Sequence, residues 1–560
     1  MMKQIVAILL LATAAFAQRE LGVRPTETGG PLMFEQAVFD VTDYEIDVKV
    51  DTKERSIVGD TLMNARIVIP TNVIVLDLDT TFTVSSIENW MDKVKWERRG
   101  AKLWIWFPQT LQNGELIAIR TKYSGKPRVA PRAPWIGGFM WEKTPSGADW
   151  VSIALQNDGA DLYFPVKDHP SDKVETASML ITVPDPLVVA APGVLDSVIK
   201  NKDKTSTYKW EVKNPIPNYS LVFNAAPYRV IKDSVKSITG EMIPIEFYIL
   251  PESYDNGAKL IAETKKYNAF YEKYLGPFPW RSQKLGIAET PHLGMEHSTM
   301  LAYGNKFNFN EDGLDWLQLH EFGHEWWANL VTASDWRDFW IHEGFQSFMD
   351  TLYIEETKGK AAYLTAMKNR ARGFKNKQPV APREPKIAYQ VYMSEPDYLN
   401  SDGDIYGKGA YFLHTLRYYV GDEAFFKALR RMAYPDKEME KKTDGSQTRL
   451  VNTDDFLTIA EAESGKKLGW LFEMYLRQPK LPKLTMMVSG PADGSATTLP
   501  RQMILRWETP NNMPFPMPVD VTYNGKTERV EMKDGTATIT FIGAMPVIDP
   551  DGWVLIELPK

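Results

Sequence analysis

The sequence contains no cysteine among its 560 residues. This excludes disulfide scaffolds, thiol nucleophiles, zinc sites with cysteine ligands, and a lipoprotein anchor, which needs a cysteine after its signal sequence. An exported protein without disulfides depends on its hydrophobic core, and on any bound metal, for stability. With 44% apolar residues the chain can build a large core, and its length predicts several domains.

Long basic runs are also missing. The 65 Lys and Arg residues are interspersed with 72 Asp and Glu residues, and the net charge is −7. A nucleic-acid-binding protein normally carries a basic face, so we expect no nucleic-acid partner. After the N-terminus, no stretch approaches the length of about 18 apolar residues that spans a bilayer, and we expect no integral membrane segment in the mature protein.

The N-terminus has the pattern of an export signal. Lys3 supplies the positive charge, residues 5–15 are apolar, and Ala15-Phe16-Ala17 fits a cleavage site. The apolar run is too short for a membrane anchor. We therefore expect a signal peptide at residues 1–17, a mature chain that starts near Gln18, and a periplasmic or extracellular protein.

The first part of the chain has mostly β periodicity. From about Tyr44 to Val230, short apolar runs are separated by Gly and Pro, and residues 44–50 alternate with period two. The runs at 180–183 and 220–223 also predict strands, and the latter overlaps the sequon Asn218-Tyr219-Ser220.

Helical spacing dominates from about Ala258 to Leu476. The clearest helical segments are 258–274, 314–331, 345–356, 409–420 and 423–432. A proline-containing linker at 478–482 follows, and later residues return to strands with hairpin signals at Asn524-Gly525 and Asp534-Gly535. The sequence thus predicts a multidomain α+β protein with an N-terminal β domain (35–232), a mostly helical domain (233–478) and a small β-sandwich (483–560).

Five of the seven histidines lie between His292 and His342, and two of them belong to an H-E-x-x-H motif at 320–324. Residues four apart on a helix share one face, so His320 and His324 are able to reach the same ion. Glu321 then lies beside the metal and suits a base that acts on metal-bound water.

A third ligand follows at a distance that suits a catalytic metal. Eighteen residues separate His324 from Glu343, which stands in the sequence E-G-F. A catalytic zinc needs three protein ligands and one open position, and two histidines with one glutamate form such a set. We expect His292, His297 and His342 to line the pocket or support the ligands, and Asp338 is a candidate to orient a zinc-bound histidine.

This pattern, an H-E-x-x-H motif followed after eighteen residues by E-G-F, resembles that of the aminopeptidase N family of gluzincin metallopeptidases. The family includes the leukotriene-A-type hydrolases. Residues 293–297 stand where the family has G-x-M-E-N, with Leu293 for Gly and His297 for Asn. The resemblance implies that Glu296 binds the α-amine of the substrate. It also implies backbone contacts to substrate from Gly294 and a pocket wall from Met295.

Two further segments match. Tyr406-Gly407-Lys408-Gly409 resembles the family's Y-x-K-G, which implies that Tyr406, just before a predicted helix, is the catalytic tyrosine. Residues 163–170 resemble F-P-C-x-D-x-P with Val166 for Cys, and counting back places Gln156 at the second amine-binding position.

The resemblance runs from about Tyr44 to Trp553. It implies a saddle-shaped β domain, a thermolysin-like catalytic domain and a β-sandwich, and we expect no C-terminal helical domain of the kind many members carry over the active site. It further implies a zinc aminopeptidase with one Zn²⁺ per chain, which acts on peptides with a free N-terminus. Glu321 would be the general base, and Tyr406 would stabilise the oxyanion.

Two other functions stay open at this point. The leukotriene-A-type branch also opens an epoxide, and Gln156 resembles that branch. A catalytically inactive relative would instead serve as a binding or scaffold protein. Inactive relatives usually lose a zinc ligand or the base, whereas this sequence keeps all of them.

Overall fold

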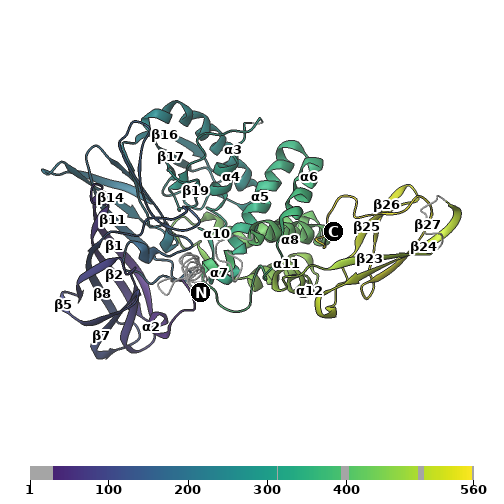
Figure 1. The fold of residues 1–560 in the computed structure, drawn as a ribbon, viewed down its shortest axis with the longest axis horizontal. Coiled ribbons are helices and arrows are strands. Elements are labelled where there is room, and N and C mark those ends of the chain that lie inside the picture. Colours follow the sequence, from purple (N-terminus) through teal and green to yellow (C-terminus); the bar gives the residue numbers. More distant parts are fainter. Residues whose placement is uncertain (1–28, 312, 393–402, 490–496, 558–560) are drawn as a thin grey trace, which may run out of the picture. The chain divides into compact units, whose positions relative to one another are not determined.

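A computed structural model describes residues 29–311, 313–392, 403–489 and 497–557 (Figure 1). The predicted signal peptide, residues 1–17, lies outside the described residues. No helix in the described ranges is long and apolar enough to cross a membrane. The chain divides into two compact units, the first made of Met1–Trp336, Pro385–Asn400 and Ala433–Leu450, the second of Arg337–Glu384, Ser401–Met432 and Val451–Lys560.

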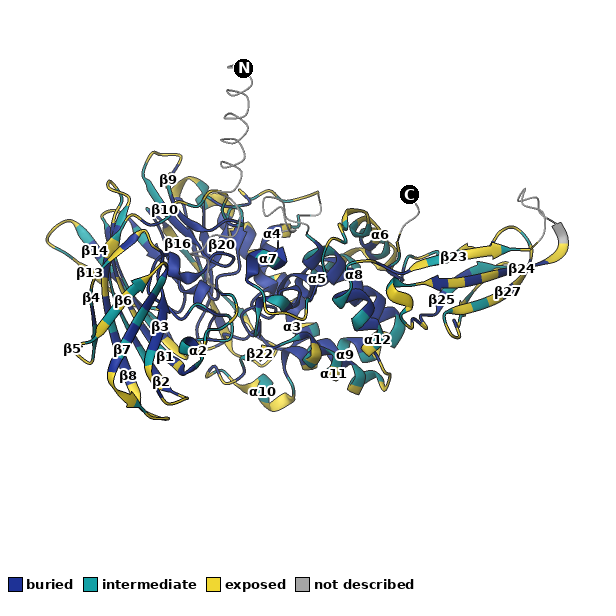
Figure 2. Cartoon of the chain, turned by 60° about the horizontal axis from the view of Figure 1, so that its bottom comes forward, coloured by how far each residue is buried: buried dark blue, intermediate teal, exposed yellow. Residues whose placement is uncertain are grey.

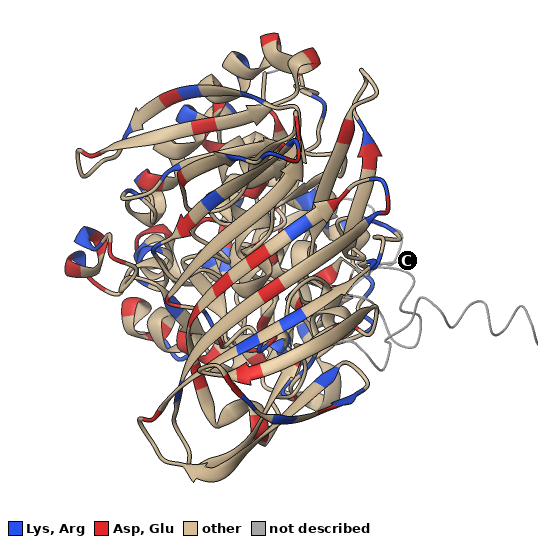
Figure 3. Ribbon diagram, turned by 90° about the vertical axis from the view of Figure 1, so that its left-hand side faces the viewer, with Lys and Arg blue, Asp and Glu red and all other residues tan. Residues whose placement is uncertain are grey.

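The first unit contains an eight-stranded sheet in the order β13-β14-β11-β1-β2-β8-β4-β5. Its strands are β1 (Phe39–Asp51), β2 (Ser56–Ile67), β4 (Phe82–Asn89), β5 (Asp92–Lys93), β8 (Leu116–Gly125), β11 (Thr176–Pro184), β13 (Val194–Lys200) and β14 (Thr205–Val212). Burial alternates along β1, which confirms the period-two prediction for 44–50. Acidic and basic residues alternate in position along these strands (Figure 3), in agreement with the interspersed charge of the sequence.

Two smaller sheets and short helices complete the β-rich part of this unit. The strand orders are β3-β7-β6 and β12-β15-β10-β9. The elements are α2 (Phe34–Ala37), β3 (Thr71–Asp77), β6 (Lys95–Arg99), β7 (Lys102–Leu111), β9 (Gly138–Lys143), β10 (Asp149–Ala154), η2 (Ala160–Leu162), β12 (Val188–Ala190) and β15 (Asn224–Ala226).

The predicted strand at 220–223 is wrong. A 3-10 turn, η3 (Asn218–Ser220), precedes it, and the strand β15 starts only at Asn224. Pro217 stands directly before the turn and has no N–H for a sheet ladder. The Asn218 side chain donates instead to the Lys167 carbonyl at 3.0 Å, which favours the turn.

A five-stranded sheet with the order β16-β17-β18-β20-β19 follows, and β19 lies at its edge. The helices α3 and α4 pack against this sheet (Figure 1). These elements are β16 (Arg229–Lys236), β17 (Met242–Ile249), η4 (Pro251–Asn256), α3 (Gly257–Leu275), β18 (Leu285–Glu289), β19 (Gly294–Met295), β20 (Leu301–Tyr303), α4 (Trp316–Gly323) and β21 (Val331–Ala333). Later segments of the same unit supply α7 (Ala388–Tyr392) and α10 (Lys437–Lys441).

The helix predicted over 314–331 is much shorter than expected. It begins after the N-cap Asp315, whose side chain accepts from the Gln318 N–H at 3.0 Å, and it ends at Gly323. Ala328 has a φ of 154°, which a helix does not allow. The side chain of Glu325 also accepts hydrogen bonds from Trp280 and Thr299, which lie in other segments. The chain therefore turns after Gly323 instead of continuing the helix.

The second unit has a helical part and a β part. The helices are α5 (Trp340–Lys358), α6 (Lys360–Arg370), α8 (Asp404–Val420), α9 (Asp422–Ala433), α11 (Thr453–Ser464), α12 (Gly469–Phe472) and a π-helical turn, η7 (Glu473–Arg477). Two three-stranded sheets, β23-β24-β27 and β26-β25-β28, follow. Their strands are β23 (Lys483–Val488), β24 (Thr497–Glu508), β25 (Val519–Tyr523), β26 (Lys526–Val530), β27 (Thr536–Gly543) and β28 (Val547–Ile548).

Two glycines let α5 and α8 approach closely in the buried interior of this unit (Figure 2). A Cβ atom on Gly344 would lie 2.9 Å from the Ile405 carbonyl oxygen and 3.0 Å from the Gly409 Cα. Both contacts are shorter than normal packing allows, so only glycine fits. Because Glu343 precedes Gly344, this helix contact also holds the backbone of Glu343 in place.

We expect Gly344→Ala to destabilise the protein by about 1–3 kcal/mol, because the added methyl group overpacks the α5–α8 contact. Urea unfolding measures the change. Gly469→Ala at the start of α12 is the matched control, since no atom lies within 4 Å of its added Cβ. Equal stability of the two variants would contradict the proposed overpacking.

Candidate metal centre

The two motif histidines converge on one point. His320 lies in the last turn of α4 and His324 directly follows the helix. Their Nε2 atoms are 3.2 Å apart, close to the separation of about 3.3 Å expected for two imidazoles on one tetrahedral zinc ion. His324 Nδ1 lies 2.7 Å from the Trp327 carbonyl oxygen. A carbonyl only accepts, so Nδ1 carries the hydrogen and Nε2 keeps its lone pair for a metal.

Glu343 is the third residue of the ligand set that the sequence predicts, and it lies in the first turn of α5. His320, His324 and Glu343 together offer three ligand atoms for a metal ion. His324 and Glu343 are buried. Two neutral imidazoles and one carboxylate match the donor set of catalytic zinc, which the residues therefore fit.

Glu321 lies directly beside the edge strand β19. A Cβ atom on Gly294 would come within 2.7 Å of Glu321 Oε1 and 2.8 Å of Leu317 Cδ1. Only glycine therefore lets the carboxylate come this close to the strand. Glu321 is 8% exposed, and Glu296, Glu321 and His324 also have ligand atoms within 4.8 Å of one another. Two buried carboxylates at this spacing form a site for positive charge.

The carboxylate of Glu296 is held by two side chains from the β-rich part of the first unit. Gln156 Nε2 donates to Glu296 Oε1, and the Tyr219 hydroxyl donates to the same oxygen at 2.9 Å. The structure thus brings Gln156 and Glu296 together, as the sequence predicts. Tyr219 is missed by the sequence analysis, although it stands inside the sequon, because nothing in its local pattern points to a distant glutamate.

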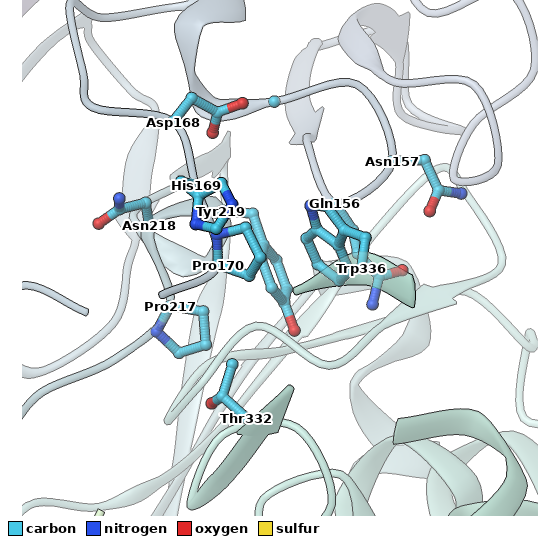
Figure 4. A pocket seen from close by; sticks show the side chains of 11 residues that line it. Gln156, Asn157, Asp168, His169, Pro170, Pro217, Asn218, Tyr219, Thr332 and Trp336 are labelled. Carbon is cyan, nitrogen blue, oxygen red and sulfur yellow. The ribbon is translucent and has the colours of Figure 1, made fainter. Parts of the chain in front are cut away.

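Gln156 and Tyr219 also line a small cavity (Figure 4). Trp336, His169 and other residues complete its lining, and its volume is about 20 Å³. The rings of Tyr219 and Trp336 are 6.0 Å apart. A volume of this size holds about one water molecule.

A buried network connects the turn after α4 with the loop that follows Glu296. Glu325 is fully buried and accepts from Trp280 Nε1 at 2.6 Å, the Thr299 N–H at 2.8 Å and Asn329 Nδ2 at 3.0 Å. Asn329 Nδ2 also donates to the Glu296 carbonyl at 2.9 Å. Burial raises the pKa of Glu325 to about 7, against the lowering effect of these donors. The network fixes Glu296 relative to the metal-binding histidine pair.

The remaining predicted residues lie as follows. Tyr406 is in the first turn of α8, not just before it, because the helix begins at Asp404. Met295 is buried in β19 beside Gly294. Asp338 accepts from the Thr453 backbone and hydroxyl, and the partner that orients His324 is the Trp327 carbonyl.

Models of two protein domains match the chain. The Peptidase M1 N-terminal domain matches residues 41–220, and the Peptidase family M1 domain matches residues 259–475. The second match includes the histidine pair, Glu321, Glu343 and Glu296.

The chain is also similar in sequence to named proteins. Aminopeptidase N of Streptomyces lividans is 26% identical over 308 residues, which are 53% of this chain and 35% of that protein. Tricorn protease-interacting factor F2 of Thermoplasma acidophilum is 22% identical over 374 residues, or 63% of this chain and 44% of that protein. The chain thus matches less than half the length of each of these relatives.

Solved structures share the fold. An M1 zinc metallopeptidase from Deinococcus radiodurans superposes with a TM-score of 0.63 at 23% identity, covering 83% of this chain and 98% of that one. Legionella pneumophila aminopeptidase A superposes with a TM-score of 0.73 at 16% identity, covering 93% and 60%. Both matches confirm a multidomain α+β architecture with a β-rich N-terminal domain and a helical catalytic domain. The two domain models together match more than half of the chain, and they show that it belongs to peptidase family M1.

Proposed function

We propose that this protein is a zinc aminopeptidase that hydrolyses the N-terminal bond of peptides. The observation that carries the proposal is the buried Glu296 carboxylate, which lies within 4.8 Å of Glu321 and His324. A buried carboxylate needs a positive partner, and the terminal ammonium of a peptide supplies one. We further propose that the protein is exported through its signal peptide and acts in the periplasm or outside the cell.

His320, His324 and Glu343 would hold one Zn²⁺ per chain. When bound, zinc polarises a carbonyl group and lowers the pKa of a coordinated water from 15.7 to about 7. Glu321 accepts the proton of the attacking water and later delivers it to the leaving amine. Tyr406 donates its O–H to the oxygen that becomes negative during the attack.

Glu296 and Gln156 restrict the reaction to the first peptide bond. Glu296 pairs with the α-ammonium of the substrate, while Gln156 and Tyr219 hold that carboxylate. A peptide whose α-ammonium pairs with Glu296 has its first residue at the metal site, so the first peptide bond is the one that is cleaved. Gly294 and Met295 contact the substrate from the edge strand.

We expect purified protein to bind about one zinc ion per chain, measured by inductively coupled plasma mass spectrometry. His324→Ala should weaken zinc binding by at least roughly 100-fold, because it removes one of three ligands. His169→Asn is the control, since that histidine lies away from the metal group and should leave the zinc content unchanged. A zinc content near zero in the wild type would favour a non-catalytic binding protein.

Glu321→Gln should lower kcat by about 10²–10⁴ while the zinc content stays at the wild-type level, because only the proton acceptor is lost. An aminoacyl-fluorophore assay measures kcat. The exposed Glu438→Gln on α10 serves as the control and should have wild-type turnover. Near-normal turnover of Glu321→Gln would exclude Glu321 as the base.

N-acetylated peptides should be cleaved roughly 10–100-fold more slowly than free peptides, because acetylation removes a charged hydrogen bond to Glu296. Chromatography of the products measures both rates. Glu296→Gln should reduce this discrimination, chiefly by raising KM for the free peptide. Equal cleavage of acetylated and free peptides by the wild type would contradict the exopeptidase assignment.

A further inference from the structure

A pocket with a volume of about 410 Å³ lies within the second unit, where the helical part meets the β part. This volume falls in the range of about 300–1,000 Å³ that is typical of ligand sites. Its wall is mostly apolar and aromatic, and it is formed by α8, by four strands and by the segment after β28. The residues that matter below include Tyr411, Leu484, Met486, Trp507, Val519 and Ile548.

The two walls of this pocket are joined by hydrogen bonds. Lys368 of α6 donates from Nζ to the Pro550 carbonyl at 2.7 Å. The Tyr411 hydroxyl of α8 donates to the Gly552 carbonyl at 2.5 Å. A ligand therefore meets walls whose spacing is already fixed, and a preformed site of this kind reduces the cost of ordering on binding.

One wall of the pocket is an edge strand. In the part of the chain that the structure describes, β23 pairs with β24 alone, so its other edge is open. The Ser489 N–H donates to the Gln502 carbonyl across this ladder, and bonded and non-bonded pairs alternate from there along an antiparallel pair. The N–H and C=O groups of Leu484 and Met486 therefore point away from β24, toward the open edge.

The start of this edge already accepts another segment of chain. The Glu557 N–H donates to the Pro482 carbonyl at 2.9 Å, and Pro482 directly precedes β23. Leu484 and Met486 come next along the same edge, and both line the pocket. Since these two residues offer backbone groups to the edge and also form the pocket wall, one extended peptide is able to use both. Its backbone pairs with β23 while one side chain enters the pocket.

The charged residues of the pocket favour a ligand that carries both signs. Asp549 is satisfied within the chain, because its carboxylate accepts from two backbone N–H groups, each at 2.8 Å. Lys368 is bonded to a carbonyl, as described above. Arg372 and Glu557 are exposed at the pocket and have no ion pair among the described residues. A short peptide has a carboxylate at one end and an ammonium group at the other, which complements this pair of opposite charges.

We propose that the open edge of β23 and this pocket form a second peptide-binding site, which takes a short extended peptide with a large apolar side chain. The peptide lies antiparallel to β23, the more stable arrangement per residue. The residue opposite Met486 places its side chain in the pocket, and the charged ends pair with Arg372 and Glu557. The site binds peptide without cleaving it, and it neither belongs to nor depends on the proposed aminopeptidase function.

Isothermal titration calorimetry with the tripeptide Ala-Phe-Ala tests the proposal. All titrations use the Glu321→Gln background, so that the peptide stays intact, and chromatography of the mixture verifies this. We expect Ala-Phe-Ala to bind this site at least about tenfold more tightly than Ala-Ala-Ala, because the ring leaves water on binding. Ala-Asp-Ala and Ala-Lys-Ala should bind no better than Ala-Ala-Ala.

A modified peptide tests the pairing with the edge strand. N-methylation of the Phe amide removes the N–H that faces β23 and should weaken binding by about threefold or more. N-methylation of the third residue is the control, because in an antiparallel ladder its N–H points away from β23. Equal weakening by the two methyl groups would overturn the proposed pairing.

One protein variant separates the pocket from the metal centre. Ala371→Phe, directly after α6, fills the pocket and should remove the advantage of Phe over Ala, while any peptide bound at the metal centre is unaffected. Ala361→Phe, at an exposed position of α6 outside the pocket lining, is the matched control and should keep the preference. The unfolding temperatures of both variants show that each one folds.

The outcomes separate this site from the aminopeptidase proposal. Peptide binding that is the same in Ala371→Phe and Ala361→Phe would overturn the second site and leave the aminopeptidase proposal intact. Equal affinity for Ala-Phe-Ala and Ala-Ala-Ala would overturn it as well. A wild type without peptidase activity, with a preference for Phe that Ala371→Phe removes, would overturn only the aminopeptidase proposal.

Discussion

Burial of negative charge is the constraint on which this site depends. Glu296 and Glu321 are 2% and 8% exposed, and they lie with His324 in a group whose ligand atoms are within 4.8 Å of one another. Two unit negative charges at such a distance repel each other by about 3 kcal/mol at an effective dielectric constant near 20. The donors Gln156 and Tyr219 offset part of this cost for Glu296. The repulsion between the two carboxylates therefore favours binding of cationic ligands at this site.

A third buried carboxylate gives the site its rigidity. The Glu325 carboxylate accepts hydrogen bonds from three separate segments, through Trp280, Thr299 and Asn329. Such a fully bonded group is costly to disturb, because any lost partner leaves a buried charge uncompensated. The turn that ends α4 at Gly323 is therefore fixed by tertiary contacts and not by local helix propensity. This places Glu296 and the histidine pair in one rigid framework.

The parts of the site that depend on local spacing were predictable from the sequence. A helix with histidines four apart fixes the pairing of His320 with His324, and the family pattern correctly associates Gln156 with Glu296. The parts that depend on tertiary contacts were not predictable. Tyr219 reaches Glu296 across 77 positions of sequence, and helical periodicity continues past Gly323 although the bonds of Glu325 end the helix there. The run at 220–223 is apolar enough for a strand, but Pro217 and the Asn218 side chain set a turn before it.

Two cavities of the first unit differ greatly in size. The cavity lined by Gln156 and Tyr219 has a volume of about 20 Å³, whereas the pocket beside His292 has a volume of about 670 Å³. The open pocket is formed by a hairpin and loops that take no part in binding the metal, so its shape is free to vary without disturbing the histidine pair.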